Sequence, residues 1–174
     1  DMLGNYSQTT YGRTAPSRSS EETPDGLYHL HFVPKKLTRE VSAVLHIEGL
    51  NNIRSATCRL GGVAESIFLA TGKTSANTVT QEFTPSNPEF SPGSPFNGTL
   101  SCEFEIFGLN VIDNNNLHLD ALLVDGKTEF EGDCTNVKIT ENDDGTGSVT
   151  LILEASTEKV SDVKPEGGAG SGFD

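Results

Sequence analysis

The chain has 174 residues and a formal net charge of −13, from 25 acidic and 12 basic side chains. Binding to nucleic acid phosphates needs a basic surface, so this balance disfavours a nucleic-acid partner. No apolar run reaches the roughly 18 residues of a transmembrane helix. What remains is a globular domain with polar ends.

Composition divides the chain into three parts. Residues 1–26 are polar and predict a linker or the end of a preceding domain. Residues 27–155 are predicted to form one domain of ordinary size. Residues 156–174 predict a flexible Gly-rich tail. The sequence starts without a signal peptide, so we expect any export signal and lipid anchor to lie upstream.

Residues 27–34 and 41–48 alternate apolar and polar side chains, and this period of two predicts strands with one buried face. The predicted buried faces are Tyr28, Leu30 and Phe32 in the first strand and Val41, Ala43, Leu45 and Ile47 in the second. The loop between the two segments predicts that they pair as a hairpin.

Further strands are predicted at about 53–60, 78–83, 99–109, 117–124, 127–134 and 149–154, with a short ambiguous segment at 64–70. Asp125-Gly126 is a strong signal for a two-residue hairpin turn. Residues 84–97 contain four prolines, which exclude a central strand and predict a long exposed loop. Together these signals predict an all-β sandwich or barrel; we favour a sandwich of about seven or eight antiparallel strands.

The three cysteines share the alternation of apolar neighbours. Cys58, Cys102 and Cys134 are all predicted to point into the core, where a thiol behaves as a small apolar side chain. A disulfide between two of them would leave the third unpaired, and the sequence leaves the pair open. The chain has no Cys-x-x-Cys, which disfavours a zinc or redox motif.

The order of strands and turns resembles a known group of proteins. The signatures are Lys36 to Ile53, Ala56 to Lys73 (ATCRLGGVAESIFLATGK), Phe96 to Gly108 and the hairpin Leu122 to Phe130. They resemble the surface lipoprotein domains of Bacteroides-type bacteria, a mostly uncharacterised family related to fimbrial anchor and tip proteins. The resemblance covers roughly residues 27–155 and includes no catalytic motif.

The resemblance implies a transthyretin-like or immunoglobulin-like β-sandwich, usually one of two tandem domains behind a lipidated cysteine. It implies a cell-surface location at the outer membrane, no enzyme activity and no cofactor. It also implies fimbria-like assembly or adhesion through contacts with other protein subunits. Fimbrial subunits of this kind are expected to polymerise by adding a strand to a neighbour's sheet edge.

Histidines suggest one candidate metal site. His29 and His31 lie two apart on one face of a predicted strand, and a turn near residue 37 would place His46 opposite His29. Imidazoles in this arrangement suit a transition metal. The alternative is a polar outer face that carries histidines by chance.

The proline-containing loop suggests a second candidate site. Phe90 and Phe96 could stack on a sugar or a protein, which is typical of a carbohydrate- or ligand-binding accessory domain. The alternative, which we favour, is that both rings turn inward and plug the sandwich.

Oxygen-rich turns and isolated nucleophiles carry less chemistry. Residues 113–116 and 141–145 could hold calcium, but Asn and Asp favour tight turns by themselves. Ser66 has no Gly-x-Ser-x-Gly surroundings. Glu103 and Glu105 are expected to be a solvated pair on one strand face. An enzyme is therefore not expected.

Overall fold

The computed structural model describes residues 19–22, 28–32, 36–110, 115–146 and 148–168. These residues form thirteen strands and two short 3-10 helices, η1 (Leu50–Asn52) and η3 (Glu166–Gly168). The prediction of an all-β fold is therefore confirmed. Among the described residues there is no helix with the length and apolar character to span a bilayer.

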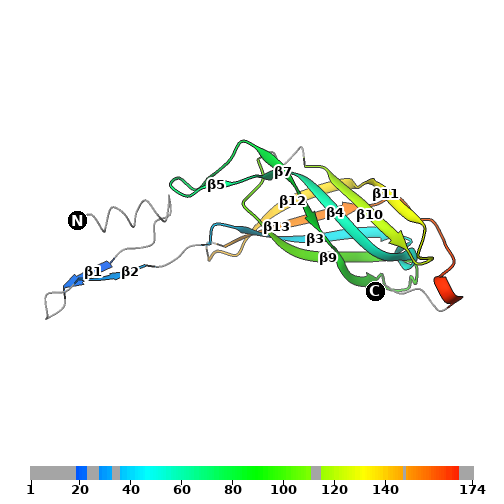
Figure 1. Ribbon diagram of the computed structural model, residues 1–174. Helices are drawn as coiled ribbons and strands as arrows, with labels where there is room; N and C mark the ends of the chain where they lie inside the picture. Colours follow the sequence, from blue (N-terminus) through cyan, green and yellow to red (C-terminus); the bar gives the residue numbers. More distant parts are fainter. Residues whose placement is uncertain (1–18, 23–27, 33–35, 111–114, 147, 169–174) are drawn as a thin grey trace.

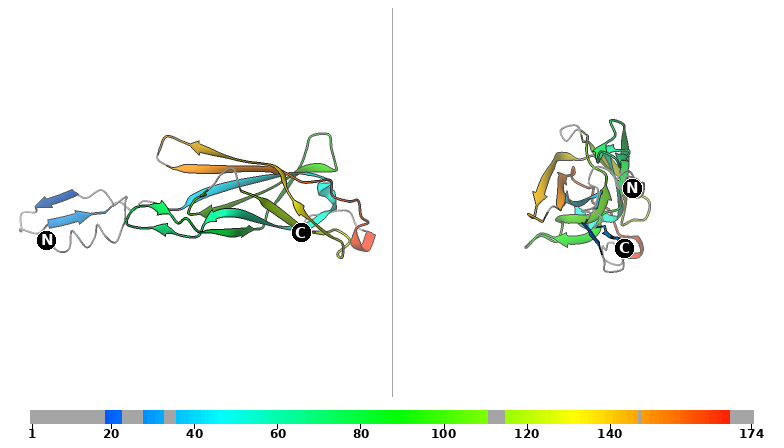
Figure 2. Two further views of the ribbon diagram at one scale, coloured as in Figure 1. Left: turned by 90° about the horizontal axis from the view of Figure 1, so that it is seen from above. Right: turned by 90° about the vertical axis from the view of Figure 1, so that its left-hand side faces the viewer.

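Two sheets make up the body of the molecule (Figures 1 and 2). The four-stranded sheet has the order β11–β10–β4–β7, and the five-stranded sheet has the order β12–β13–β3–β9–β8. Their strands are β3 (Arg39–Glu48), β4 (Ile53–Ala64), β7 (Thr78–Phe83), β8 (Ser86–Phe90), β9 (Asn97–Ile106), β10 (Leu117–Leu123), β11 (Glu129–Asp133), β12 (Thr135–Asp143) and β13 (Val149–Ser156). Two small hairpins complete the strands: β1 (Ser19–Glu22) with β2 (Tyr28–His31), and β5 (Ile67–Phe68) with β6 (Lys73–Thr74).

The apolar core lies between the two sheets, which is the arrangement of a sandwich. On β3 the buried residues are the four odd positions that the alternation predicts, Val41, Ala43, Leu45 and Ile47. The rings of Phe83 on β7 and Phe104 on β9 stack across the layers with centroids 4.4 Å apart. Each fully buried large side chain contributes about 1.5–3 kcal/mol, so this core is the main source of stability.

The sequence predicted antiparallel strands throughout, and this prediction is wrong for one pair. β13 lies beside β3 in parallel, with Leu151 paired to Val41 and Ala155 to Leu45. The C-terminal strand thus enters the sheet between β12 and β3, a long-range pairing that leaves no local signal. The finer prediction of a transthyretin-like or immunoglobulin-like sandwich stays a prediction.

The predicted hairpin between residues 27–34 and 41–48 is wrong. β2 pairs with β1, and both sides of β3 are occupied by β13 and β9. Leu30 and Phe32 are each 38% exposed, so they belong to no buried face. The β1–β2 hairpin lies apart from the two sheets in Figure 1, and the sandwich begins after it, with β3, and not at residue 27.

The flexible tail predicted after residue 155 is wrong for residues 157–168, which pack against the sandwich. The side chain of Val160 is completely buried in the core. Asn52 donates a hydrogen bond from Nδ2 to Oδ1 of Asp162 over 3.0 Å. Because a packed apolar side chain anchors the segment, it belongs to the domain. Residues 169–174, like most of residues 1–26, lie outside the described residues.

The proline-containing stretch is partly a strand. β8 pairs with β9 at the edge of the five-stranded sheet, which agrees with the exclusion of a central strand. Its pairing is irregular, with Asn87 at φ 53°. Gly98 allows the close approach of the two strands, because a Cβ there would lie 2.0 Å from the carbonyl oxygen of Glu89.

Candidate functional site

The structure does not bring the three predicted histidines together. His29 pairs with Glu21 through the backbone, and its side chain lies outside the described residues. His31 pairs with Ser19. His46 lies on β3, where it pairs with Thr99 of β9 and Ser156 of β13 and not with a residue of β2. The register that would place His29 opposite His46 is wrong, and the metal hypothesis for this trio loses its geometric basis.

Phe90 ends β8 and Phe96 lies just before β9, so the two residues flank the turn between these strands, and both are exposed. Their exposed fractions are 47% and 59%, so the prediction that they plug the sandwich is wrong. Hydrogen bonds donated by backbone N–H groups stabilise the turn. The N–H of Ser91 donates to the carbonyl of Asn97 over 2.9 Å, and the N–H of Asn97 donates to Oγ of Ser94 over 3.2 Å. The two aromatic rings are therefore presented on an ordered turn.

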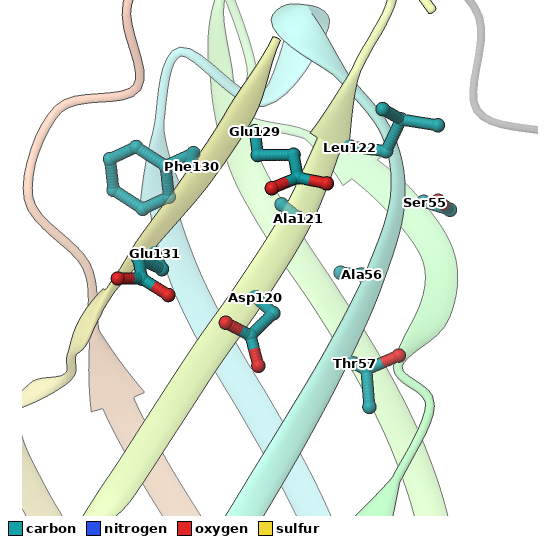
Figure 3. Close-up of a pocket in the computed structure, with 9 residues that line it drawn as sticks. All are labelled: Ser55, Ala56, Thr57, Asp120, Ala121, Leu122, Glu129, Phe130 and Glu131. Atoms are coloured by element: carbon teal, nitrogen blue, oxygen red, sulfur yellow. The ribbon is translucent and has the colours of Figure 1, made fainter. Parts of the chain in front are cut away.

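The outer face of the four-stranded sheet is hollowed over β4, β10 and β11. The depression has a volume of about 340 Å³. Its lining is Ser55, Ala56, Thr57, Asp120, Ala121, Leu122, Glu129, Phe130 and Glu131 (Figure 3). Figure 3 shows the carboxylates of Asp120, Glu129 and Glu131 on the same side of the two neighbouring strands. The charged side chains that line this depression are therefore all acidic.

Charged side chains continue from the depression along the same face. On adjacent strands, His118 is opposite Asp133 and Asp120 is opposite Glu131. His118 Nδ1 lies 2.9 Å from Oδ1 of Asp133, and His118 Nε2 lies 3.5 Å from Oδ1 of Asp120. Arg59 Nη2 contacts the other oxygen of Asp120 at 2.6 Å.

The carboxylates favour the protonated form of this histidine. The hydrogen bond with Asp133 raises the pKa of His118 above its ordinary value, and the negative charge of Asp120 acts in the same direction. Partial burial and the charge of Arg59 oppose the increase in pKa. His118, Asp120 and Glu131 offer one ligand atom each, and these three atoms lie within 4.8 Å of one another.

The three cysteines carry free thiols and do not form a reactive centre. Cys58 is completely buried, and Cys102 and Cys134 are half-buried. Burial raises the pKa of Cys58 strongly and raises the pKa of Cys134 to about 11. A thiol is nucleophilic only as a thiolate. These thiols therefore act as apolar packing groups.

The acidic turn at 141–145 uses its oxygens internally. Asp143 Oδ1 accepts a hydrogen bond from the N–H of Gly145, and Asp144 Oδ1 accepts one from the N–H of Thr146, both over 2.8 Å. This is ordinary turn chemistry. In the other oxygen-rich turn, residues 113–114 lie outside the described residues.

The four sheet edges differ in how they are protected against further pairing. β11 carries an acid at every second position, and β8 contains Pro88 next to the left-handed Asn87. β12 begins with an irregularity, with Asn136 at φ 52°, and contains Lys138. Acids, lysine, proline and bulges are the usual means of blocking an edge.

β7 has fewer of these features: it carries one acid, Glu82, and the irregularity in its pairing with β4 places the extra residue on β4. Its sequence TVTQEF includes neither glycine, proline nor a basic residue, and half of it is β-branched. Within the part of the chain that the structure describes, β7 pairs only with β4. Among the four edges of the two described sheets, the free side of β7 is therefore the least protected.

The sequence reasoning did not identify His118, Asp120 and Glu131. The signal was available in the Asp125-Gly126 turn. A two-residue turn there places residue 120 opposite 131 and residue 118 opposite 133, and the structure has this register.

Comparisons with known proteins identify no relative. No family model matches the chain, no curated protein matches it and no solved structure matches it. The argument for function therefore depends on the residues and on the geometry described above.

Proposed function

We propose that the chain is a non-enzymatic cell-surface domain that takes part in a fimbria-like or adhesive assembly. In this assembly a strand of a partner protein subunit pairs with the free side of β7. The observation that supports the proposal is the free side of β7, which has the least protection of the four sheet edges. Unpaired N–H and C=O groups at such an edge accept an added strand by the ordinary hydrogen bonds of a sheet.

The side chains of β7 also suit an added strand. Val79 and Phe83 have the same parity on the strand, but Val79 is 41% exposed whereas Phe83 is 5% exposed. A strand paired to β7 would cover Val79 and extend the apolar layer past the present edge. Burial of this valine would add to the backbone hydrogen bonds.

The other strand edges would contribute little to this pairing. Acidic side chains repel each other across an acidic edge, and a bulge interrupts the ladder of hydrogen bonds. We therefore assign the contact to β7 and not to β8, β11 or β12. This assignment makes the proposal specific enough to test by substitution.

The test uses a lysine placed on the edge. Thr80→Lys on β7 and the matched control Thr140→Lys on β12 each change an exposed threonine of an edge strand. Each full-length variant is expressed in the native host cells. The measured quantity is the fraction of the protein that sediments with the surface assemblies. We expect recovery to fall for Thr80→Lys and to stay at the wild-type level for Thr140→Lys. Equal recovery of both variants and the wild type would contradict the proposal.

A carbohydrate- or ligand-binding role is the second candidate, because Phe90 and Phe96 are exposed on a braced turn. Exposed aromatic rings stack on sugar faces. A glycan array probed with the wild type, Phe90→Ala and Phe96→Ala tests this role. Binding to a defined glycan that both substitutions abolish would support it, and absence of binding by the wild type would exclude it for the glycans on the array.

A further inference from the structure

The strands β10 and β11 place two carboxylates directly opposite each other on the outer face. Asp120 and Glu131 are paired residues in the register of these strands. Like charges in opposite positions destabilise a strand pair unless a cation lies between or beside them. Arg59 contacts Oδ2 of Asp120, but among the described residues Glu131 is in no ion pair. Arg59 therefore offsets the charge of Asp120 at Oδ2, while the charge of Glu131 is not offset by an ion pair among the described residues.

His118 adds a nitrogen ligand to these two carboxylates. It lies two residues before Asp120 on the same face of β10, and its Nε2 is 3.5 Å from Oδ1 of Asp120. Two ligand atoms bound tetrahedrally to Zn²⁺ at about 2.0–2.1 Å are roughly 3.3 Å apart. The spacing of this first pair is close to that value, and small rotations of the exposed Glu131 side chain would bring in the third ligand.

Asp133 holds the histidine in the orientation that metal binding needs. Its Oδ1 lies 2.9 Å from Nδ1 of His118, where it accepts a hydrogen bond from Nδ1–H, and Nε2 is directed towards Asp120. When a metal displaces the proton of Nε2, this nitrogen supplies the lone pair. A carboxylate behind a ligating histidine is the common outer arrangement of protein metal sites, where it fixes the tautomer and raises the basicity of the ligand. This contact orients the ligating nitrogen of His118 towards the two other ligands.

The charge and the surroundings favour a divalent transition metal. With a neutral His118, the three acids and Arg59 give the cluster a formal charge of −2, which one divalent ion would neutralise. An imidazole among the ligands favours zinc and its neighbours over calcium and magnesium, which prefer oxygen alone. Asp120 and Glu131 also line the depression, so the remaining coordination position could be reached from it (Figure 3).

We propose that His118, Asp120 and Glu131 bind a divalent transition metal ion, with Zn²⁺ as the first candidate, and that Asp133 positions His118. The site lies on β10 and β11, and β11 is the edge strand opposite β7 in the four-stranded sheet. It is therefore independent of the contact that we assign to β7, and either proposal can fail without the other.

The test measures Zn²⁺ binding to the full chain, purified without a histidine tag, stripped of metal and kept reduced. Isothermal titration with zinc against a competing chelator gives the stoichiometry and the affinity. We expect one ion per chain, with at least tenfold weaker binding for His118→Ala and for Glu131→Gln. Asp133→Asn is expected to weaken binding by about 10–100-fold, as is usual for a positioning carboxylate. The matched control is His46→Ala, an exposed histidine on β3, and it should bind zinc as the wild type does.

Cobalt(II) supplies a readout of the ligands. The wild type loaded with Co²⁺ should show the intense visible bands of a tetrahedral site without a thiolate charge-transfer band, and His118→Ala should lose them. Zinc binding that is unchanged in His118→Ala, or reduced equally in His46→Ala, would overturn the proposal. A thiolate band in the cobalt spectrum would overturn it too, because the ligands would then include a cysteine. An unchanged affinity in Asp133→Asn would overturn the positioning role given to Asp133.

Discussion

Replacing Val160 by alanine tests whether the segment after β13 is part of the folded domain. Val160 is completely buried, and its N–H donates to the carbonyl of Glu48 over 2.9 Å. The substitution keeps this backbone bond and removes two methyl groups from the core. The effect on stability therefore reports on side-chain packing alone.

The expected loss can be worked out from these two groups. Burial of a methyl or methylene group contributes about 0.8 kcal/mol, which gives about 1.6 kcal/mol for the pair. The cavity left behind adds about 1 kcal/mol at about 24 cal/mol per Å³. The free energy of unfolding should fall by about 2–3 kcal/mol, which corresponds to a decrease in Tm of about 8–12 °C for a domain of this size.

Urea unfolding followed by circular dichroism measures this change. The midpoint should shift to lower urea while the m-value stays the same. The control is Lys159→Ala, at the neighbouring exposed position, which should change the free energy of unfolding by less than about 0.5 kcal/mol. If Val160→Ala were as stable as the control, residues 157–168 would not be packed and our description of the domain boundary would be wrong.

Three further predictions concern the thiols, a turn and a glycine. Because burial raises the pKa of Cys134 to about 11, only about one Cys134 thiol in a thousand is ionised at pH 8. Alkylation of the native protein should therefore leave Cys58 and Cys134 unmodified in the mass spectrum. Unfolding in urea should make both thiols reactive. Hydrogen bonds from Thr128 lower the pKa of Asp125 below its ordinary value of 3.8, so its contribution to stability is present above pH 3.8 and is lost as the pH falls through the lowered pKa. Asp125→Ala should therefore be less stable than the wild type at pH 7, and this difference in unfolding free energy should shrink below pH 3.8; a constant difference would refute the assignment. Gly98→Ala should displace β8 from β9, since the new Cβ would lie 2.0 Å from a backbone oxygen, and faster amide hydrogen exchange in β8 would show it, whereas unchanged exchange would contradict it.

The local part of the fold could be predicted from the sequence. The alternation in 41–48 identified the buried face of β3, and the Asp125-Gly126 turn identified the hairpin of β10 and β11. Both signals depend on neighbours in the sequence. The prolines of residues 84–97 likewise excluded a central strand because proline lacks the N–H that a ladder needs.

The long-range part could not be predicted. The parallel pairing of β13 with β3 joins Ala155 to Leu45, and no turn connects them. The same alternation in 27–34 suggested a core strand, yet Leu30 and Phe32 are partly exposed because β3 already has two partners. A period of two indicates which face a strand buries, but not which strand lies beside it.

The site was missed for a different reason. The sequence search looked for several histidines close together, whereas the cluster of β10 and β11 contains one histidine and three acids from two strands. The correct hairpin register was already implied by Asp125-Gly126. Applying that register to every polar residue of the hairpin would have placed Asp120 opposite Glu131.

Site-specific photocrosslinking at the edge of β7 tests the central proposal most directly. A photoreactive phenylalanine analogue replaces Val79 on β7 or, as the control, Thr140 on the edge strand β12; both positions are exposed. The full-length protein is irradiated on the cells that naturally produce it, and adducts are identified by mass. We predict a discrete protein adduct at position 79 that is absent at position 140. Adducts of equal yield at the two positions, or no adduct at position 79, would contradict strand addition at β7.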